Sequence, residues 1–191
     1  MIVTESPSTQ RPVTLDEAKD HLRVYENDED AEILAIIDTA ALAAERYCRF
    51  PFTSRTITAT DYRFRDSVIL PTPVIHAFTS ITYVDVNGDT QTLDAAEYDV
   101  LMDEPPSVLL GIDKSWPDIA EHRQAVTYTY EGGYAPDGAD YRANIPRPLR
   151  HCVLLMCGEL YEHREAREDF AASENPTYMR MLNLYAHRVV V

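Results

Sequence analysis

The chain has 191 residues, of which 45% are hydrophobic, and its 17 basic and 32 acidic residues give a net charge of −15. This length fits one domain, or one domain that carries a sizeable insertion. No apolar run approaches the ~20 residues of a membrane span, and so acidic a chain is poorly suited to displacing counterions from phosphates. We therefore expect neither a membrane protein nor an ordinary DNA-binding protein.

The N-terminal segment predicts a short capped helix. Residues 1–11 are polar, have neither the basic nor the apolar region of a secretory signal, and are expected to be mobile or extended. Thr14 and Glu17 have the spacing of a capping box, in which each side chain accepts the backbone amide of the other residue. A short apolar face then follows at helical spacing, so the first helix begins at this box.

A second, longer helix is expected to begin at Asn27 or Asp28. Acidic side chains are favourable at its start because the N-terminus of a helix carries partial positive charge. Its apolar stripe contains many alanines, which permit close approach of another helix, and Pro51 ends it.

From Thr53 onward the apolar residues alternate with a period of two, which is typical of β-strands. The dipeptide Asn87-Gly88 between two such runs predicts a hairpin. Strands of this length and spacing are typical of a small antiparallel sandwich or barrel. The expected strands lie at 56–64, 67–70, 78–86, 90–93, 98–102, 108–112 and 125–130.

The C-terminal segment returns to helical spacing. Pro146 and Pro148 lie where a third helix begins, and Asn175-Pro176 reads as the start of a last one. The fold class is therefore α+β: a helical body of about four helices from both chain ends, with a central antiparallel β-sandwich or barrel-like insertion. The expected boundaries are 1–52 and 135–170 for the two helical parts, 53–134 for the β insertion, and 171–191 for a C-terminal docking arm.

The residues that carry chemistry form no catalytic pattern. The six histidines have no metal-ligand spacing, and no serine lies in a nucleophile motif. Cys48, Cys152 and Cys157 are expected to be free buried thiols. Tyr128 and Tyr130 share one strand face, which suits either a sugar- or base-stacking platform or a core. We expect no catalytic residue, no metal and no cofactor, and the alternative function is a small virion-associated enzyme or a carbohydrate-binding module.

Four segments in this order resemble the head–tail connector, or adaptor, proteins of tailed bacteriophages and of the related gene transfer agents. Each segment alone is weakly specific, but the combination covers most of the chain. The segments are 12–23 with the acidic start of the second helix, 70–74 leading into 81–88, 126–134, and 145–149 leading to 160–166.

The resemblance implies a structural adaptor rather than an enzyme. Such a protein forms a homo-oligomeric ring, commonly twelve-fold, between the portal protein of the capsid and the stopper or tail-completion protein. DNA passes through its lumen without specific binding. The resemblance also implies a place in the head–tail neck of the virion, synthesis in the bacterial cytoplasm, and no membrane partner.

Two sets of residues are expected to carry this function. The C-terminal arm resembles that of the family, but Ala186-His187 separates Tyr185 from Arg188 where the family often has a Tyr-Arg pair. The set that docks on the portal or on a neighbour is Tyr178, Leu182, Tyr185, Arg188 and Val189. The set that makes the lumen acidic is Asp16, Asp20, Asp28, Glu29, Asp30 and Glu32.

Overall fold

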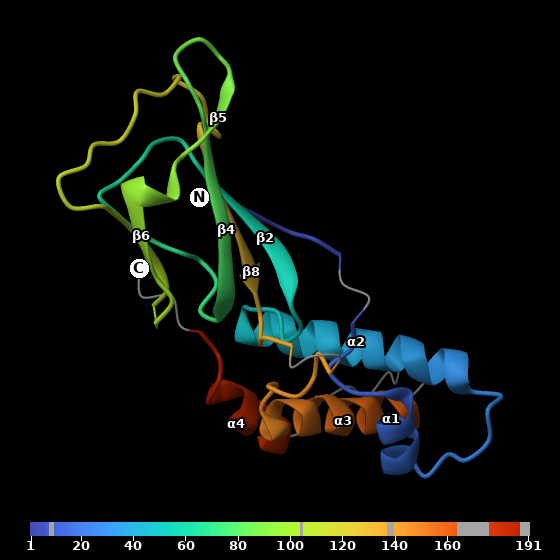
Figure 1. Cartoon of the computed structure of the whole chain (residues 1–191). Coiled ribbons are helices and arrows are strands. Elements are labelled where there is room, and N and C mark those ends of the chain that lie inside the picture. Colours follow the sequence, from blue (N-terminus) through green and yellow to red (C-terminus); the bar gives the residue numbers. More distant parts are fainter. Residues whose placement is uncertain (8–9, 104, 137–139, 164–175, 188–191) are drawn as a thin grey trace. The chain divides into compact units, whose positions relative to one another are not determined.

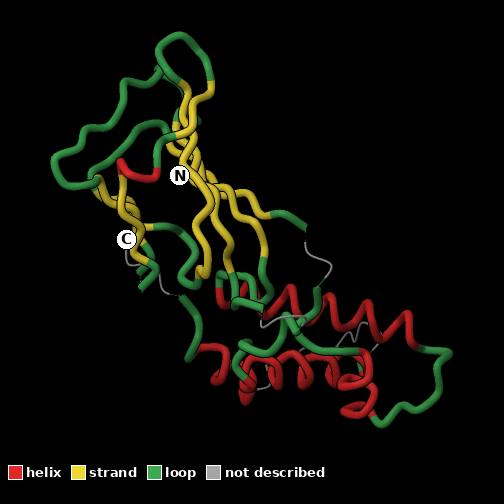
Figure 2. The backbone as a smooth tube through the Cα atoms, in the orientation of Figure 1, coloured by secondary structure: helices red, strands yellow, loops and turns green. Residues whose placement is uncertain are grey.

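The computed structural model describes residues 1–7, 10–103, 105–136, 140–163 and 176–187. The chain divides into two compact units. Unit 1 is made of strands and comprises Met1–Ser8 and Ser54–Ala135, and unit 2 is helical and comprises Thr9–Thr53 and Pro136–Val191 (Figures 1 and 2). The expected α+β class is confirmed. Among the described residues, no helix is long and apolar enough to cross a membrane.

Four α-helices form the described part of the helical unit: α1 Leu15–Leu22, α2 Asp30–Cys48, α3 Arg147–Glu162 and α4 Pro176–Asn183. The two long helices, α2 and α3, lie side by side although about a hundred residues separate them in the sequence (Figure 1). The apolar stripe predicted for α2 is buried, and its alanines Ala40 and Ala44 are fully covered. On α3, Leu149 and Val153 are buried as well. Burial of these two faces is the main source of stability for this unit.

The capping box that the sequence predicts is present at the start of α1. The Glu17 amide donates to the Thr14 hydroxyl at 3.0 Å, and the Thr14 amide donates to the Glu17 carboxylate at 2.8 Å. The start of α2 differs from the prediction, because the helix begins at Asp30 and no side chain caps it. Asn27, one of the two expected first residues, instead accepts a hydrogen bond from the Lys19 ammonium at 2.7 Å.

The strands form two antiparallel sheets rather than a closed barrel in the described part of the chain. The larger sheet has the order β1-β2-β8-β4-β5, and the smaller one has the order β3-β7-β6. The strands are β1 Ile2–Glu5, β2 Arg55–Asp61, β3 Ser67–Ile69, β4 Ile75–Val84, β5 Thr90–Thr92, β6 Tyr98–Leu101, β7 Ser107–Leu110 and β8 Val126–Gly132, and a short 3-10 helix spans Ala95–Glu97. Each expected strand is found, with shifts of a few residues at its ends.

Both sheets contribute side chains to one apolar core. Tyr128 and Tyr130 on β8 are fully buried and lie in the same cluster as Ile57 of β2 and Val108 of β7. Burial raises the pKa of Tyr130 to about 12. The shared face of the two tyrosines is therefore a core face, and it offers no platform on which a sugar or base could stack.

The Asn87-Gly88 hairpin joins β4 to β5 as predicted. Gly88 has a φ of +90°, a conformation that L side chains rarely adopt. The Asp85 amide donates to the Asp89 carbonyl at 2.9 Å, and the Asp85 carboxylate accepts the amides of Asn87 and Asp89. The amide of Asp89 and the side chain of Gln91, the two largest influences, lower the pKa of Asp85 because they stabilise its ionised form.

The first residues of the chain differ from the expectation. Ile2–Glu5 form β1, which pairs with β2 and belongs to the β unit rather than to the N-terminal helical part. The segment has four pairing residues and lies at the edge of the sheet, and so short a run gives no recognisable period in the sequence.

The segment from α4 to His187 packs against the C-terminal part of α2. Leu182 of α4 is only 1% exposed, and the Asn183 side chain accepts a hydrogen bond from the Tyr47 hydroxyl at 2.7 Å. The His187 amide donates to the Cys48 carbonyl at 3.0 Å, which gives a partner to a carbonyl at the C-terminus of α2. The last helix ends at Asn183.

This packing predicts different effects for two neighbouring leucines. Leu182→Ala should lower the free energy of unfolding by about 2–5 kcal/mol, since it leaves a cavity in a closed core. Leu184→Ala, at a side chain that is 82% exposed, should change it by less than about 0.5 kcal/mol. Urea unfolding followed by far-ultraviolet circular dichroism measures both. Equal stability of the two variants would show that α4 is not packed on the helical unit.

Candidate assembly surfaces

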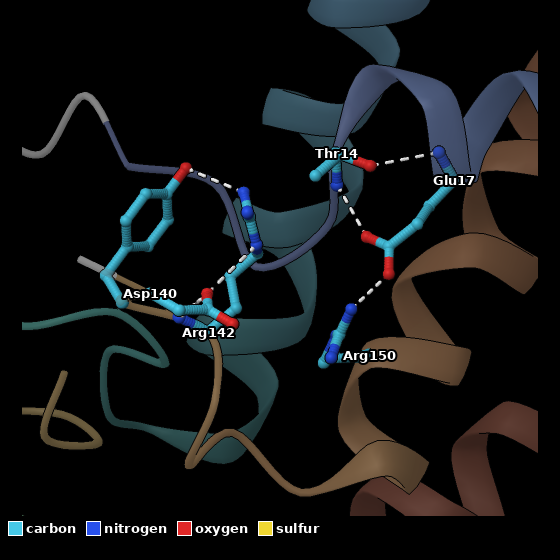
Figure 3. Close-up of polar contacts among 6 residues, drawn as sticks. Thr14, Glu17, Asp140, Arg142 and Arg150 are labelled. Carbon is cyan, nitrogen blue, oxygen red and sulfur yellow. Dashed lines mark hydrogen bonds and ion pairs between the residues drawn. The ribbon is translucent and has the colours of Figure 1, made fainter. Parts of the chain in front are cut away.

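Glu17 holds together elements from the two ends of the chain. One carboxylate oxygen accepts the Thr14 amide, and the other pairs with the Arg150 guanidinium on α3 (Figure 3). The residue thus caps α1 and fastens α1 to α3 at the same time. The sequence indicates the capping role, but the pairing with Arg150 depends on the tertiary fold.

Two more ionic contacts fix loops of the helical unit. Arg11 binds the Asp38 carboxylate through two nitrogens at 2.7 and 2.8 Å, and the hydrogen bonds to Asp38 raise the pKa of Arg11. Arg142 donates to the Tyr141 hydroxyl at 3.1 Å and lies 3.5 Å from the Asp140 carboxylate (Figure 3). These contacts order the segments that lead into α1 and α3.

The six acidic residues expected in the lumen lie on α1 and around the start of α2. Asp16, Asp20, Asp28 and Glu32 are exposed. Asp30 pairs with Lys19 at 2.7 Å, and Glu29 accepts a hydrogen bond from the Tyr161 hydroxyl. The structure therefore brings the set into one region, but Asp30 and Glu29 also serve contacts within the unit.

The residues expected to dock on a partner differ in their exposure. Tyr178 and Tyr185 are half-buried, and Leu182 is buried inside the helical unit. Arg188 and Val189 lie outside the described residues. Leu184, which the sequence reading did not select, is the most exposed apolar side chain in this segment. The sequence did not reveal the exposure of Leu184, because this exposure depends on where the preceding helix ends.

An open groove runs between the start of α2 and the end of α3. Ala35, Ile36 and Thr39 line it from α2, and Leu160 lines it from α3, with Glu32 and His163 at the same place. Most of these side chains are apolar. The two titratable side chains, Glu32 and His163, lie on the exposed surface of the helical unit. The groove suits a protein contact better than catalysis.

One serine lies near a histidine in the β unit. Ser54 Oγ is 3.3 Å from His76 Nε2, and His76 Nδ1 is 3.1 Å from the Gly133 carbonyl. The Ser54 hydroxyl also lies within 3.4 Å of the Glu131 carboxylate, to which Thr56 donates at 2.8 Å. The group links side chains along β2, β4 and β8, so a structural role explains it.

Thiol and metal chemistry are equally unsupported in the described part of the chain. Cys48, Cys152 and Cys157 are free and buried. Burial, the largest cause at each site, raises the pKa of Cys48 and Cys157 to about 12 and of Cys152 to about 11. No group of three or more histidine, cysteine or acidic side chains is arranged to hold a metal ion among the described residues.

Comparison with known proteins first gives a family match over part of the chain. Residues 12–87 match the family of phage gp6-like head-tail connector proteins, and this confirms the resemblance expected from the sequence. The matched region runs from the entry to α1 through the hairpin turn after β4. A search of the curated proteins gave no match.

Three solved structures then show the particular fold over the whole chain. The neck of an empty GTA particle computed with C6 symmetry contains a chain with a TM-score of 0.79, and the virion of a native gene transfer agent (GTA) particle contains one with 0.78. The neck of a native GTA particle computed with C12 symmetry gives 0.77. Each is 22% identical, and each match covers 100% of this chain and 98% of the other. The chain therefore has, from end to end, the fold of a chain in these particles.

Two substitutions at Glu17 should separate its roles. Glu17→Gln keeps an acceptor for the capping box but removes the charge opposite Arg150, and should cost about 0.2–1 kcal/mol, as for a partly exposed ion pair. Glu17→Ala removes both contacts and should cost about 1–2 kcal/mol. Urea unfolding gives both values, with the exposed Asp20→Ala as control. If Glu17→Ala were no worse than Glu17→Gln, the capping contact would not contribute.

Proposed function

We propose that this protein is a structural head–tail adaptor that forms a ring in the neck of a phage-like particle. The observation that supports this most directly is the match of the complete fold to chains in gene transfer agent particles, two of them from the neck. The connector-family match over residues 12–87 supports the same role independently. The two sheets of the β unit, which we infer to pack as an open sandwich, elaborate a helical adaptor body.

The ring is proposed to contain twelve copies. Support comes from the symmetries with which the related necks were computed, C6 and C12. A rotational ring requires two different surfaces on each subunit, because every contact joins the front of one copy to the back of the next. One side of the ring would bind the portal protein, and the other the stopper or tail-completion protein.

The exposed acidic side chains of α1 and α2 are proposed to face the lumen. Asp16, Asp20, Asp28 and Glu32 would repel the phosphates of passing DNA, and the net charge of −15 strengthens this field. DNA could then move through the ring without being held.

This proposal predicts that the purified protein does not bind duplex DNA at physiological salt. Replacing Asp16, Asp20 and Glu32 by lysine should create salt-sensitive binding, because it places cations where phosphates pass. The same change at three exposed acids of the β unit, Asp99, Asp118 and Glu121, is the matched control for the added charge and should give weaker binding in the same mobility-shift assay. An electrophoretic mobility shift by the unmodified protein would contradict the proposed lumen.

Docking on the portal is proposed for α4 and the segment after it. The proposed contact still comprises Tyr178, Tyr185, Arg188 and Val189. The exposed Leu184 adds an apolar anchor. Leu182 is left out, because it belongs to the core of the helical unit. Leu184→Asp should therefore weaken portal binding while leaving the fold intact.

Ring formation should depend on the portal. Subunits that each carry a charge of −15 repel one another when they close into a ring, and salt screens this only in part. The portal offers equivalent sites at fixed spacing and so raises the local concentration of neighbours. At micromolar concentration, light scattering should show a monomer. Negative-stain images should show rings at high concentration and high salt, or when the portal is present. A stable ring at low concentration and low salt without portal would contradict templating, and no ring under any of these conditions would contradict the proposed function.

A further inference from the structure

The strand β1 presents a regular edge that no other described strand covers. It is the outermost strand of the five-stranded sheet, and all four of its residues are exposed. Its register with β2 runs without interruption from Ile2 opposite Thr60 to Glu5 opposite Ile57. Ile2 is 54% exposed and Val3 42%. Of the devices that commonly prevent an edge from pairing with another strand, β1 has a short length and one charged residue, Glu5, which lies 3.5 Å from Arg55. It contains no lysine, proline or bulge.

The register shows which backbone groups of β1 face outward. The Ser6 amide donates to the Thr56 carbonyl at 2.9 Å, and partners in an antiparallel ladder alternate between bonded and non-bonded pairs. Thr4 and Ile2 are therefore the residues that bond to β2. The N–H and C=O groups of Val3 and Glu5 point away from the sheet and are free to meet another strand.

The opposite edge of the same sheet is β5. The Leu93 amide donates to the Ile81 carbonyl at 2.9 Å, so by the same alternation Thr90 and Thr92 direct their backbone groups outward. The part of β4 that β5 does not cover has two register irregularities, between Ile75 and Ala77 and between Phe78 and Ser80. These irregularities disfavour pairing there and leave β5 as the regular part of this edge.

We propose that neighbouring copies of this chain join through these two edges, with β1 of one copy pairing with β5 of the next. The inference rests on the proposed ring, because a ring needs two different edges that meet head to tail. Every neighbouring pair in the sheet is antiparallel, so β1 and β5 of one copy run in the same direction. The contact between copies is therefore a parallel pair, held by the outward groups of Val3 and Glu5 on one side and of Thr90 and Thr92 on the other.

Proline substitutions test this pairing at single amides. Val3→Pro removes an N–H that faces outward, and prolines are tolerated at such edge positions. Thr92→Pro does the same on β5. Val3→Ala keeps the amide and is the matched control. Thr4→Pro removes an amide that bonds to β2, and it should lower the thermal midpoint instead.

Sedimentation velocity is measured at the concentration and salt at which the unmodified protein forms rings. Val3→Pro and Thr92→Pro should each fold, by circular dichroism, but require at least tenfold more protein to assemble. Val3→Ala should form rings. An equal mixture of the two proline variants retains one intact β1 and one intact β5, and it should give two-chain complexes.

Three outcomes overturn the proposal. If Val3→Pro forms normal rings, β1 is not a contact between subunits. This holds even if the variant fails to enter particles, because β1 could then pair with another neck protein. Proline variants that stay monomeric when mixed exclude the β1–β5 pair. Absence of rings from the unmodified protein under every condition rejects the proposed function together with this contact, whereas the first two outcomes reject the contact alone.

Discussion

The packing of α2 against α3 is the contact on which the helical unit depends. These helices come from opposite sides of the β unit in the sequence, so their contact joins distant segments of the chain. Small side chains such as Ala40 and Ala44 let the backbones approach, and Leu149 and Val153 fill the space. Glu17 and Arg150 then hold α1 to the same pair. Because the β unit is inserted between the two helical segments, its sequence can vary without changing the core between α2 and α3.

The acidic charge of the chain affects its behaviour on two levels. Within the helical unit it is partly neutralised by specific pairs, such as Lys19 with Asp30 and Arg11 with Asp38. The remaining exposed carboxylates act collectively, since a charge of −15 on each copy opposes association and repels nucleic acid. In the proposed ring, a contact between copies would therefore be supplied by short-range interactions. Backbone hydrogen bonds at a sheet edge carry no net charge.

The sequence predicted the elements well and their tertiary relations poorly. The capping box of Thr14 and the Asn87-Gly88 hairpin depend on neighbouring residues alone, so local rules identify them. The sequence places the start of α2 too early. Asn27 instead accepts a hydrogen bond from Lys19, a contact that the sequence pattern does not contain. Leu182 was assigned to a docking surface because an apolar stripe looks the same whether a partner or the same chain covers it. The strand Ile2–Glu5 was missed because its pairing partner lies more than fifty residues away.

The three buried thiols have a consequence if, as proposed, the chain serves in a particle that leaves its cell. A thiol with a pKa of about 12 is ionised in only about one molecule in 10⁵ at neutral pH, and the thiolate is the form that oxidants attack. In the proposed particle, Cys48, Cys152 and Cys157 would therefore react slowly with oxidants. The durability of the protein outside the cell would then come from the same dense packing that joins the two ends of its chain.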